Sequence, residues 1–260
     1  MTVMESHSRS CGQIDKYKPS KNRWLWVLGG LFAISIAILV AHDVPTEATA
    51  EDRTKAQLIL AQAVYDDPEE MERNLTTFEG QISAIIAVQD AVLTVAPMDI
   101  GIPFDTAREP GDLLVWKRGL CFDRSRAIEK ILVSFGLETR HVAVYSVAQT
   151  GSKFVSLLTP SVSSHAISEV KTAKGWMVID SNARWIGLTE DGMAISLKDL
   201  RSLDHAAVRW SSRNRAKINW ILGKEFTYVI GLYSRHGRFF APYSPVPDYN
   251  IRHLLTGLFS

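Results

Sequence analysis

The sequence has only two cysteines, Cys11 and Cys121, among its 260 residues. Two cysteines cannot build the disulfide framework that stabilises many small secreted domains. The chain also has little net charge, because 29 Lys and Arg residues against 28 Asp and Glu residues leave +1. A balance so close to zero argues against bulk attraction to nucleic acid or to an acidic membrane surface.

Several functional signatures are also missing from the sequence. It contains no internal repeat, no phosphate-binding P-loop, no dinucleotide fingerprint and no clustered metal-ligand spacing, and its seven histidines are scattered. The composition, 46% hydrophobic and 22% charged, suits a globular domain of ordinary size with appendages.

One long hydrophobic run stands near the N-terminus. Residues 24–41, WLWVLGGLFAISIAILVA, contain no charged side chain and would span about 27 Å as a helix, enough for a bilayer core. We interpret the run as a transmembrane helix with Trp24 and Trp26 as interfacial anchors. Two alternatives stay open: a signal peptide cleaved near Ala48-Thr49-Ala50, and a buried helix of a soluble fold.

The charges on either side of this run predict its orientation. Basic residues precede it: Arg9, Lys16, Lys18, Lys21 and Arg23. Acidic residues follow it: Asp43, Glu47, Glu51 and Asp52. The positive-inside rule therefore predicts a single-pass protein with a cytoplasmic N-terminus and an extracytoplasmic main domain, periplasmic if the host is Gram-negative.

We expect five segments along the chain. They are a disordered cytoplasmic tail (1–23), the transmembrane helix (24–41), a linker (42–50) and an extracytoplasmic domain (51–260) whose core covers about 74–190, with a C-terminal extension at 191–260. Hydrophobic periodicity predicts helices over 51–65, 74–95 and 122–135, and strands over 141–147, 154–158, 165–170 and 176–180. Residues 226–233 and 238–243 are predicted to form a hairpin. The fold class is α+β, with helices packed on an antiparallel sheet.

Cys121 stands where the helix over 122–135 is expected to begin. Unpaired backbone N–H groups and the positive end of the helix dipole favour a thiolate over a thiol at such a position, and the thiolate is the nucleophile. Outside the cytoplasm, Cys121 would have no cysteine partner in its own chain, which suits a reactive thiol. The alternative is a small buried hydrophobe, the usual role of a free cysteine.

A histidine and a carboxylate follow on a predicted hairpin. His165 begins one strand, a turn lies at Ala173-Lys174-Gly175, and Asp180 ends the next strand. If the register allows, these side chains can meet, so that His165 acts as the base for a thiol while Asp180 orients its ring. Taken singly, His165 could be a surface histidine and Asp180 a turn residue.

The order of these motifs resembles that of a known family. Gly119-Leu120-Cys121 before a helix, Gly136 to Val142 (GLETRHV), His165-Ala166 on a strand and Trp176 to Asp180 (WMVID) resemble the transglutaminase-like superfamily of papain-type cysteine enzymes, in a bacterial-type, membrane-anchored form. The resemblance covers roughly residues 110–185. It implies Cys121 as nucleophile, His165 as general base and Asp180 as its orienter. Ile167 departs from the pattern, because family members often have an aromatic residue there.

Several auxiliary roles are predicted near these residues. Trp116 could donate its indole N–H to an oxyanion hole, although a packing role is the commoner one for a tryptophan. Asn182 is a reserve candidate for orienting His165. The charged residues Asp123, Arg124 and Arg126 are interpreted mainly as a solvated or salt-bridged helix face.

The favoured function is a membrane-anchored extracytoplasmic cysteine enzyme that acts on amide bonds through an acyl-thioester. Water as the acceptor gives a peptidase or amidase, and an amine gives a transglutaminase; the substrate would be a protein or peptide, with the cell envelope as one source. No metal or organic cofactor is needed. The alternative is a non-catalytic module of the same fold that serves as a binding or scaffold component of a cell-envelope or polysaccharide assembly.

Overall fold

The computed structural model describes residues 21–63, 68–205, 207–212 and 217–258, so Cys11 and most of the predicted tail lie outside the described residues. The last three residues assigned to that tail, 21–23, belong to the first helix instead. The chain divides into two compact units, residues 1–41 and residues 42–260. The helices are α1 (Lys21–Ala41), α2 (Ala50–Gln62), α3 (Pro68–Asn74), α4 (Phe78–Val95), α5 (Pro110–Trp116), α6 (Cys121–Ser134), α7 (Lys153–Leu158), α8 (Leu197–Ser202) and α9 (Ile251–Leu258). The strands are β1 (Thr139–Ser146), β2 (Ser164–Thr172), β3 (Gly175–Ile179), β4 (Phe226–Ile230), β5 (Leu232–Tyr233) and β6 (Asp248–Tyr249).

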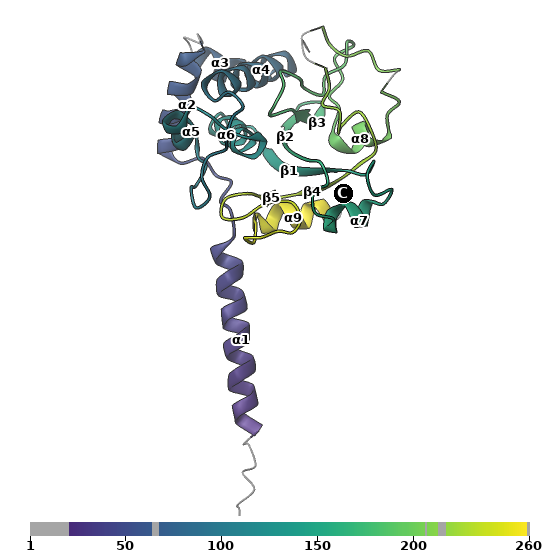
Figure 1. Ribbon diagram of the computed structural model, residues 1–260. Coiled ribbons are helices and arrows are strands. Elements are labelled where there is room, and N and C mark those ends of the chain that lie inside the picture. Colours follow the sequence, from purple (N-terminus) through teal and green to yellow (C-terminus); the bar gives the residue numbers. More distant parts are fainter. Residues whose placement is uncertain (1–20, 64–67, 206, 213–216, 259–260) are drawn as a thin grey trace, which may run out of the picture. The chain divides into compact units, whose positions relative to one another are not determined.

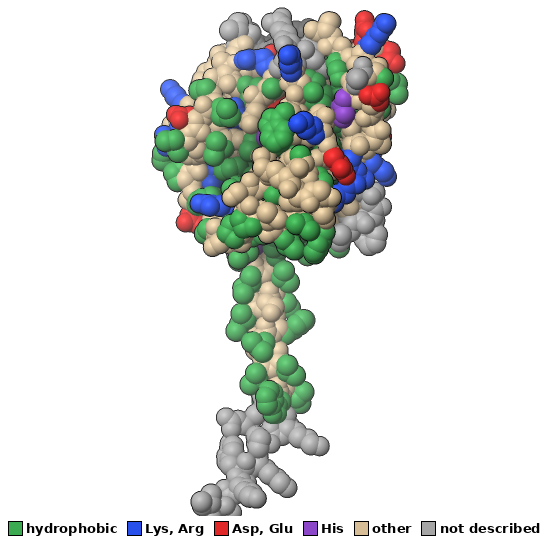
Figure 2. Space-filling view, turned by 45° about the vertical axis from the view of Figure 1, so that its right-hand side comes forward, with side chains coloured by type: hydrophobic (Ala, Val, Ile, Leu, Met, Phe, Trp, Pro, Cys, Tyr) green, Lys and Arg blue, Asp and Glu red, His purple; other side chains and the backbone are tan. Residues whose placement is uncertain are grey.

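The described part of the first unit is α1, and the described side chains of this helix are all exposed. Figure 2 shows hydrophobic side chains along the length of this helix. Residues 24–41 are long and apolar enough to cross a membrane, and none of this stretch is buried. An exposed apolar helix near the N-terminus is consistent with a signal sequence or a single membrane anchor.

The second unit is an α+β domain built on a four-stranded antiparallel sheet of order β3-β2-β1-β4. β2 and β3 form the predicted hairpin, and Gly175 in its turn has φ +114°, a conformation that favours glycine. In this register His165 faces Val144 on β1, and Ser168 faces Ile179 on β3. Asp180 follows the last residue of β3, so the hairpin brings the candidate histidine and carboxylate to nearby positions.

Helices cover one side of this sheet, with α6 packed against β2 (Figure 1). The residues Ala127, Ile128 and Ile131 of α6 are fully buried and join a core with apolar residues of α2 and α4. The predicted end of α6 is confirmed: Gly136 has φ +85°, and its N–H donates to the carbonyl of Val133 at 2.9 Å.

Residues 185–222 supply a second core on the sheet. Trp185, Leu197 and Leu222 pack there with Val142 and Ile167 of the sheet. This segment contains α8 and appears in green in Figure 1. Because both cores bury sheet residues, the central strands β1 and β2 are buried along almost their whole length.

Three predicted elements differ in the structure. Residues 154–158 form part of helix α7 rather than a strand, because a short apolar run fits either period and Ser152 caps the helix by accepting from the N–H of Val155 at 3.4 Å. The helix predicted over 74–95 begins at Phe78, where Thr77 caps it. The predicted hairpin of 226–233 and 238–243 is wrong.

The strands of that C-terminal region take other partners. β4 pairs with β1, and β5 pairs with β6. Residues 238–243 contain Pro242, and Pro245 follows closely; neither has a backbone N–H to donate to a strand ladder. The chain therefore reaches residue 248 before it pairs with β5.

Candidate functional site

Cys121 is the first residue of α6, and its free thiol is half-buried. Leu120 caps the helix, and its N–H donates to the Asp123 carboxylate at 2.8 Å. The first N–H groups of an α-helix have no partner within the helix, and they carry the positive end of its dipole. The local sequence thus places the sulfur where negative charge is favoured.

His165 and Asp180 form a buried pair in which the histidine Nε2 lies 3.0 Å from the carboxylate Oδ1. The same oxygen accepts the backbone N–H groups of Asn182 at 2.7 Å and Ala183 at 3.2 Å. Burial raises the pKa of Asp180, but the charge and hydrogen bond of His165, together with the two backbone donors, lower it overall. Asp180 is therefore held as a carboxylate facing His165.

The thiol of Cys121 acts on the same imidazole and contributes to the pKa of His165. Burial lowers the pKa of His165, but the Asp180 charge and hydrogen bond, followed by a hydrogen bond and charge from Cys121, raise it to about 10. Since Nε2 faces Asp180, Nδ1 is the ring nitrogen that remains for the thiol. The structure pairs His165 with Asp180, and the thiol of Cys121 acts on the pKa of the same imidazole.

One carbonyl group ties together the three segments that carry these residues. The oxygen of Ala166, next to His165, accepts the hydroxyl of Ser125 at 3.0 Å and that of Ser181 at 2.6 Å. Ser125 lies one turn along α6 from Cys121, and Ser181 follows Asp180. Both hydroxyl groups are buried, so water does not compete for these hydrogen bonds, and the bonds hold the three segments in fixed relative positions.

Gln89 on α4 holds the segment after Asp180 from the other side. Its side-chain Nε2 lies within hydrogen-bond distance of three carbonyl oxygens, those of Asp180 (2.7 Å), Ala183 (3.0 Å) and Trp185 (2.8 Å). The side chain is buried and is the one amide among the buried residues of an otherwise apolar helix face. The sequence carried a signal for this role, because a glutamine on the apolar face of an Ile- and Ala-rich helix needs a buried partner.

Arg124 is predicted to lie on the solvated or salt-bridged face of α6, and the structure buries it beside the candidate site. It lies one turn after Cys121, is buried, and donates to the side-chain oxygen of Asn182. Burial lowers the pKa of Arg124, while the charges of Cys121, Asp180 and Asp123 act in the opposite direction. Asn182 therefore does not orient His165 with its side chain; it accepts from Arg124 and supports Asp180 through its backbone N–H.

Of the two readings of this charged face of α6, solvated or salt-bridged, the solvated one is wrong and the salt-bridged one is confirmed for Asp123 and Arg126, since Asp123, Arg124 and Arg126 are all buried. Asp123 pairs with Arg108, and Arg126 lies 2.6 Å from the carboxylate of Glu109. Arg108 and Glu109 belong to the segment before α6. Their side chains cover the charged face of the helix and pair with it in place of solvent. Buried charges need such partners, so these pairs fix where α6 begins.

Trp116 has no described contact that would support an oxyanion role. Its side chain is 39% exposed at the end of α5, and the Arg118 guanidinium lies 5.2 Å from its ring centroid. None of the described hydrogen bonds links its indole to Cys121 or His165. The oxyanion role of Trp116 therefore stays a prediction without geometric support, and the backbone N–H groups of the first turn of α6 are the better donors.

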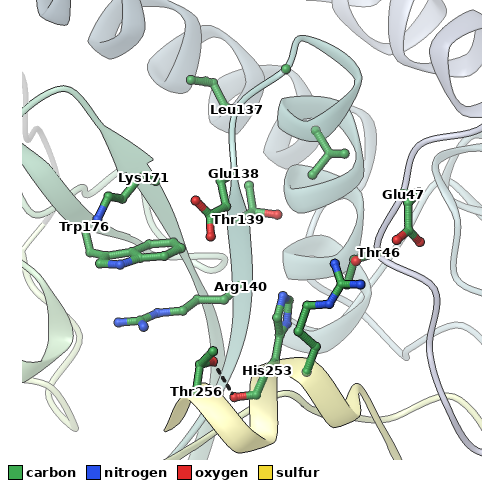
Figure 3. Close-up of a pocket in the computed structure, with 13 residues that line it drawn as sticks. Thr46, Glu47, Leu137, Glu138, Thr139, Arg140, Lys171, Trp176, His253 and Thr256 are labelled. Carbon is green, nitrogen blue, oxygen red and sulfur yellow. Dashed lines mark hydrogen bonds between the residues drawn. The ribbon is translucent and has the colours of Figure 1, made fainter. Parts of the chain in front are cut away.

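A cavity of about 620 Å³ lies elsewhere in the domain. Figure 3 shows Arg140, Lys171 and Trp176 reaching into it from the sheet, with His253 and Thr256 on α9. Arg140 and Lys171 both lie against the ring of Trp176, at 4.2 Å and 5.3 Å from its centroid. Neither Cys121, His165 nor Asp180 lines this cavity, so we assign it no part in the chemistry.

Comparisons with known proteins add little to this geometry. No protein-family model matches the sequence, and no curated protein matches it. A crystal structure described as "a Putative Cysteine Protease from Cytophaga hutchinsonii" is similar with a TM-score of 0.34 and 14% sequence identity, over 59% of this chain and 48% of that one. The similarity is partial, and this chain spans about half the length of that protein. A likeness of this size does not assign a function.

Proposed function

We propose that the globular unit is a cysteine enzyme that acts on amide bonds through an acyl-thioester. The observation that carries this proposal is the buried imidazole of His165, which pairs with the Asp180 carboxylate and whose pKa is raised in part by the Cys121 thiol at a helix N-terminus. A half-buried thiol next to a carboxylate-held histidine fits nucleophilic catalysis, because the histidine can accept and return a proton.

In the first step the Cys121 thiolate attacks the carbonyl carbon of an amide. A C–S bond forms, and the electron pair of the C=O π bond moves onto the oxygen. The oxyanion so formed lies near the unpaired N–H groups at the start of α6, which stabilise negative charge. The His165 imidazolium then donates its proton to the leaving nitrogen as the C–N bond breaks. An acyl-thioester on Cys121 and a neutral His165 result.

In the second step an acceptor attacks the thioester carbonyl while His165 takes its proton. The thiolate of Cys121 leaves, and His165 is again an imidazolium paired with Asp180. Water as the acceptor makes the enzyme a peptidase or amidase, and an amine makes it a transglutaminase. Both outcomes use the same three residues, and the transglutaminase-like family resemblance is compatible with either.

We further propose that α1 anchors this enzyme with its globular unit outside the cytoplasm. The exposed apolar helix and the basic residues before it, with acidic residues after it, support this orientation. A reporter that is active only outside the cytoplasm should work when fused after Ser260. Activity of a cytoplasmic reporter alone would overturn the orientation, and a mature chain beginning near Glu51 would identify a cleaved signal.

The thiol chemistry can be tested without a known substrate. The full chain in detergent micelles is treated with limiting iodoacetamide at pH 7, and alkylation of the two cysteine-containing peptides is followed by mass spectrometry. Cys11 serves as the internal reference thiol in the same molecule. We expect Cys121 to react at least about ten times faster, because an ordinary thiol is only about 3% ionised at this pH.

Two variants make this measurement specific. Cys121→Ala should remove the fast phase and leave the circular dichroism spectrum unchanged, since it deletes one half-buried sulfur atom. Cys11→Ser should leave the fast phase intact. Equal rates for the two thiols, or a slower rate for Cys121, would contradict the proposed nucleophile.

A further inference from the structure

A second group of convergent side chains lies among residues far apart in the sequence. The segment 42–44 runs beside β6: the N–H of Val44 donates to the carbonyl of Tyr249 at 2.8 Å, and the N–H of Tyr249 donates to that of His42 at 3.0 Å. This pairing places His42 next to Asp248, the first residue of β6. The loop after β5 then brings His236 to the same carboxylate.

The three side chains point ligand atoms at one place. The Asp248 Oδ1 lies 2.6 Å from the Nδ1 of His236 and 3.4 Å from the Nδ1 of His42. The two imidazole rings are 5.6 Å apart and cross at 72°, so they approach the oxygen from different directions. One nitrogen from each ring and one carboxylate oxygen lie within 4.8 Å of one another.

A hydrogen bond accounts for the position of His236 against Asp248 but not for that of His42. His236 and Asp248 can share a proton at 2.6 Å, but the Nδ1 of His42 is buried and has no hydrogen-bond partner. Ligand atoms around a tetrahedral Zn²⁺ are about 3.3 Å apart, given metal–ligand distances near 2.0 Å. The His42–Asp248 separation fits this value, and the His236–Asp248 separation would need to lengthen by about 0.7 Å.

The surroundings of Asp248 also suit a metal ligand. The side chain is fully buried, and its second oxygen, Oδ2, accepts the backbone N–H groups of Arg235 at 3.0 Å and His236 at 2.8 Å. These bonds fix the carboxylate and leave Oδ1 for the two histidines, as outer-shell bonds do in metal sites. Both histidine side chains are partly exposed, at 23% and 40%, so an ion and a water ligand can enter.

We propose that His42, His236 and Asp248 bind a divalent transition-metal ion, for which Zn²⁺ is the best match. Two imidazole nitrogens and one carboxylate oxygen are the donor set that such an ion prefers, and water completes the coordination. The ion joins the residue that follows α1 to the segment 236–248 at the other end of the domain. It would close a loop of most of the globular unit, so its effect is on stability, and it takes no part in the chemistry at Cys121.

The test uses Co²⁺ as a spectroscopic substitute for Zn²⁺. The full chain in detergent is stripped of metal, and its thiols are blocked with iodoacetamide so that Cys11 and Cys121 cannot bind the ion. Titration with Co²⁺ should produce the visible absorption of a tetrahedral complex at one ion per chain, and added Zn²⁺ should abolish it. Absence of this spectrum would overturn the proposal.

Three histidine variants locate the ion. His42→Ala and His236→Ala should each lose the Co²⁺ spectrum, whereas His205→Ala, which removes a partly exposed histidine outside the cluster, should keep it. His42→Ala is the sharper variant, since its Nδ1 has no hydrogen bond to lose and the fold should be unaffected. Retention of the spectrum in His42→Ala would place the ion elsewhere and contradict the site.

A thermal measurement keeps the proposal testable if a variant folds poorly. Zn²⁺ should raise the melting temperature of the thiol-blocked wild-type chain, and a chelator should reverse the rise. His205→Ala should show the same rise. No change in the wild-type melting temperature at saturating Zn²⁺ would overturn the stabilising role.

Discussion

Two buried histidine–carboxylate pairs lie on neighbouring strands of the same sheet. His165 on β2 is 3.0 Å from Asp180, and His141 on β1 is 2.7 Å from Glu129 of α6. All four side chains are almost completely inaccessible. By distance and burial alone, the two pairs could serve the same purpose.

Their third partners separate them. The half-buried thiol of Cys121, at the start of α6, is a charge and hydrogen-bond partner of His165 and raises its pKa. Beside the other pair stands Ser168, which is fully buried and donates its hydroxyl to the same Glu129 oxygen at 2.7 Å. The ring of His141 is stacked on Tyr233 with centroids 4.3 Å apart.

This difference shows what a buried histidine needs for chemistry. The hydroxyl of Ser168 and the imidazole of His141 both bind the same oxygen of Glu129. The serine therefore donates its proton to the carboxylate and not to the histidine. In the other pair the histidine stands between the acid and the thiol, which is the order that proton transfer requires. We infer that the His141–Glu129 pair holds α6 against the sheet, whereas the His165–Asp180 pair serves Cys121.

The largest effect should separate the two histidines by reactivity. His165→Ala removes the proton partner of Cys121, so alkylation at pH 7 should slow by at least about tenfold, to the rate of the reference thiol Cys11. Raising the pH should restore the rate. His141→Ala should leave the rate unchanged but lower the free energy of unfolding by at least about 1–3 kcal/mol, because Glu129 loses a buried partner.

Alkylation rates and urea denaturation of both variants would check this pair of outcomes. A His141→Ala chain that folds normally yet reacts as slowly as His165→Ala would show that the contrast between the pairs is false. Equal stability losses with equal rates would likewise remove any separate role for His165.

The sequence predicted the positions of Cys121, His165 and Asp180 because each stands at the end of a strongly periodic element. A helix over 122–135 and a hairpin with a glycine turn are local patterns, and they place their end residues without further information. The structure has these elements and pairs His165 with Asp180, while Cys121 at the start of α6 acts on the pKa of His165. Their catalytic roles stay a proposal.

The environment of α6 could not be predicted in the same way. Arg124 and Arg126 look like surface residues because a charged helical position is usually solvated. Their burial depends on Glu109 and Asn182, which come from other segments, and no local pattern records that approach. The same reason hid His42 and His236, whose convergence depends on the pairing of the segment 42–44 with β6.

The second largest effect should come from Asp180, the carboxylate that raises the pKa of His165. Asp180→Asn removes the charge that raises the pKa of His165 to about 10, so the imidazolium should lose its proton at lower pH. Alkylation of Cys121 at pH 7 should then slow, by less than in His165→Ala, because less of the imidazolium is present to pair with the thiol. NMR titration of the His165 ring measures the change in its pKa directly.

The free energy of unfolding should depend on pH differently in the wild type and in Asp180→Asn. A histidine whose folded pKa of about 10 exceeds the ordinary 6.5 stabilises the fold fully below pH 6.5, and this contribution disappears as the pH rises toward 10. The gap in free energy of unfolding between wild type and Asp180→Asn should therefore narrow from pH 6.5 to 10. Asp90→Asn, which breaks an exposed pair with Arg184, is the matched control and should show little effect at any pH. A gap that widens over this range would contradict the assigned protonation of His165.

The smallest effect should come from Gln89, which touches neither histidine. Gln89→Leu keeps the size of the side chain but removes the amide donor that the carbonyl groups of Asp180, Ala183 and Trp185 share, at a cost of about 1–3 kcal/mol in the free energy of unfolding. The carbonyl groups of Ala183 and Trp185 keep one backbone donor each, so the carbonyl of Asp180 is the most affected. Because that amide fixes the segment after Asp180, alkylation of Cys121 should also slow, by less than in Asp180→Asn.

Gln81 on the same helix provides the control that distinguishes positioning from general destabilisation. Its amide donates to the carbonyl of Leu75 at 3.0 Å and accepts the N–H of Ala173 at 2.8 Å, away from the segment after Asp180. Gln81→Leu should therefore lower stability without changing the alkylation rate or the NMR titration of His165. If both glutamine variants slowed Cys121 in proportion to their loss of stability, Gln89 would be a structural residue only. A loss of reactivity confined to Gln89→Leu would show that the precision of the His165–Asp180 pair, which the His141–Glu129 pair does not need, is maintained from α4.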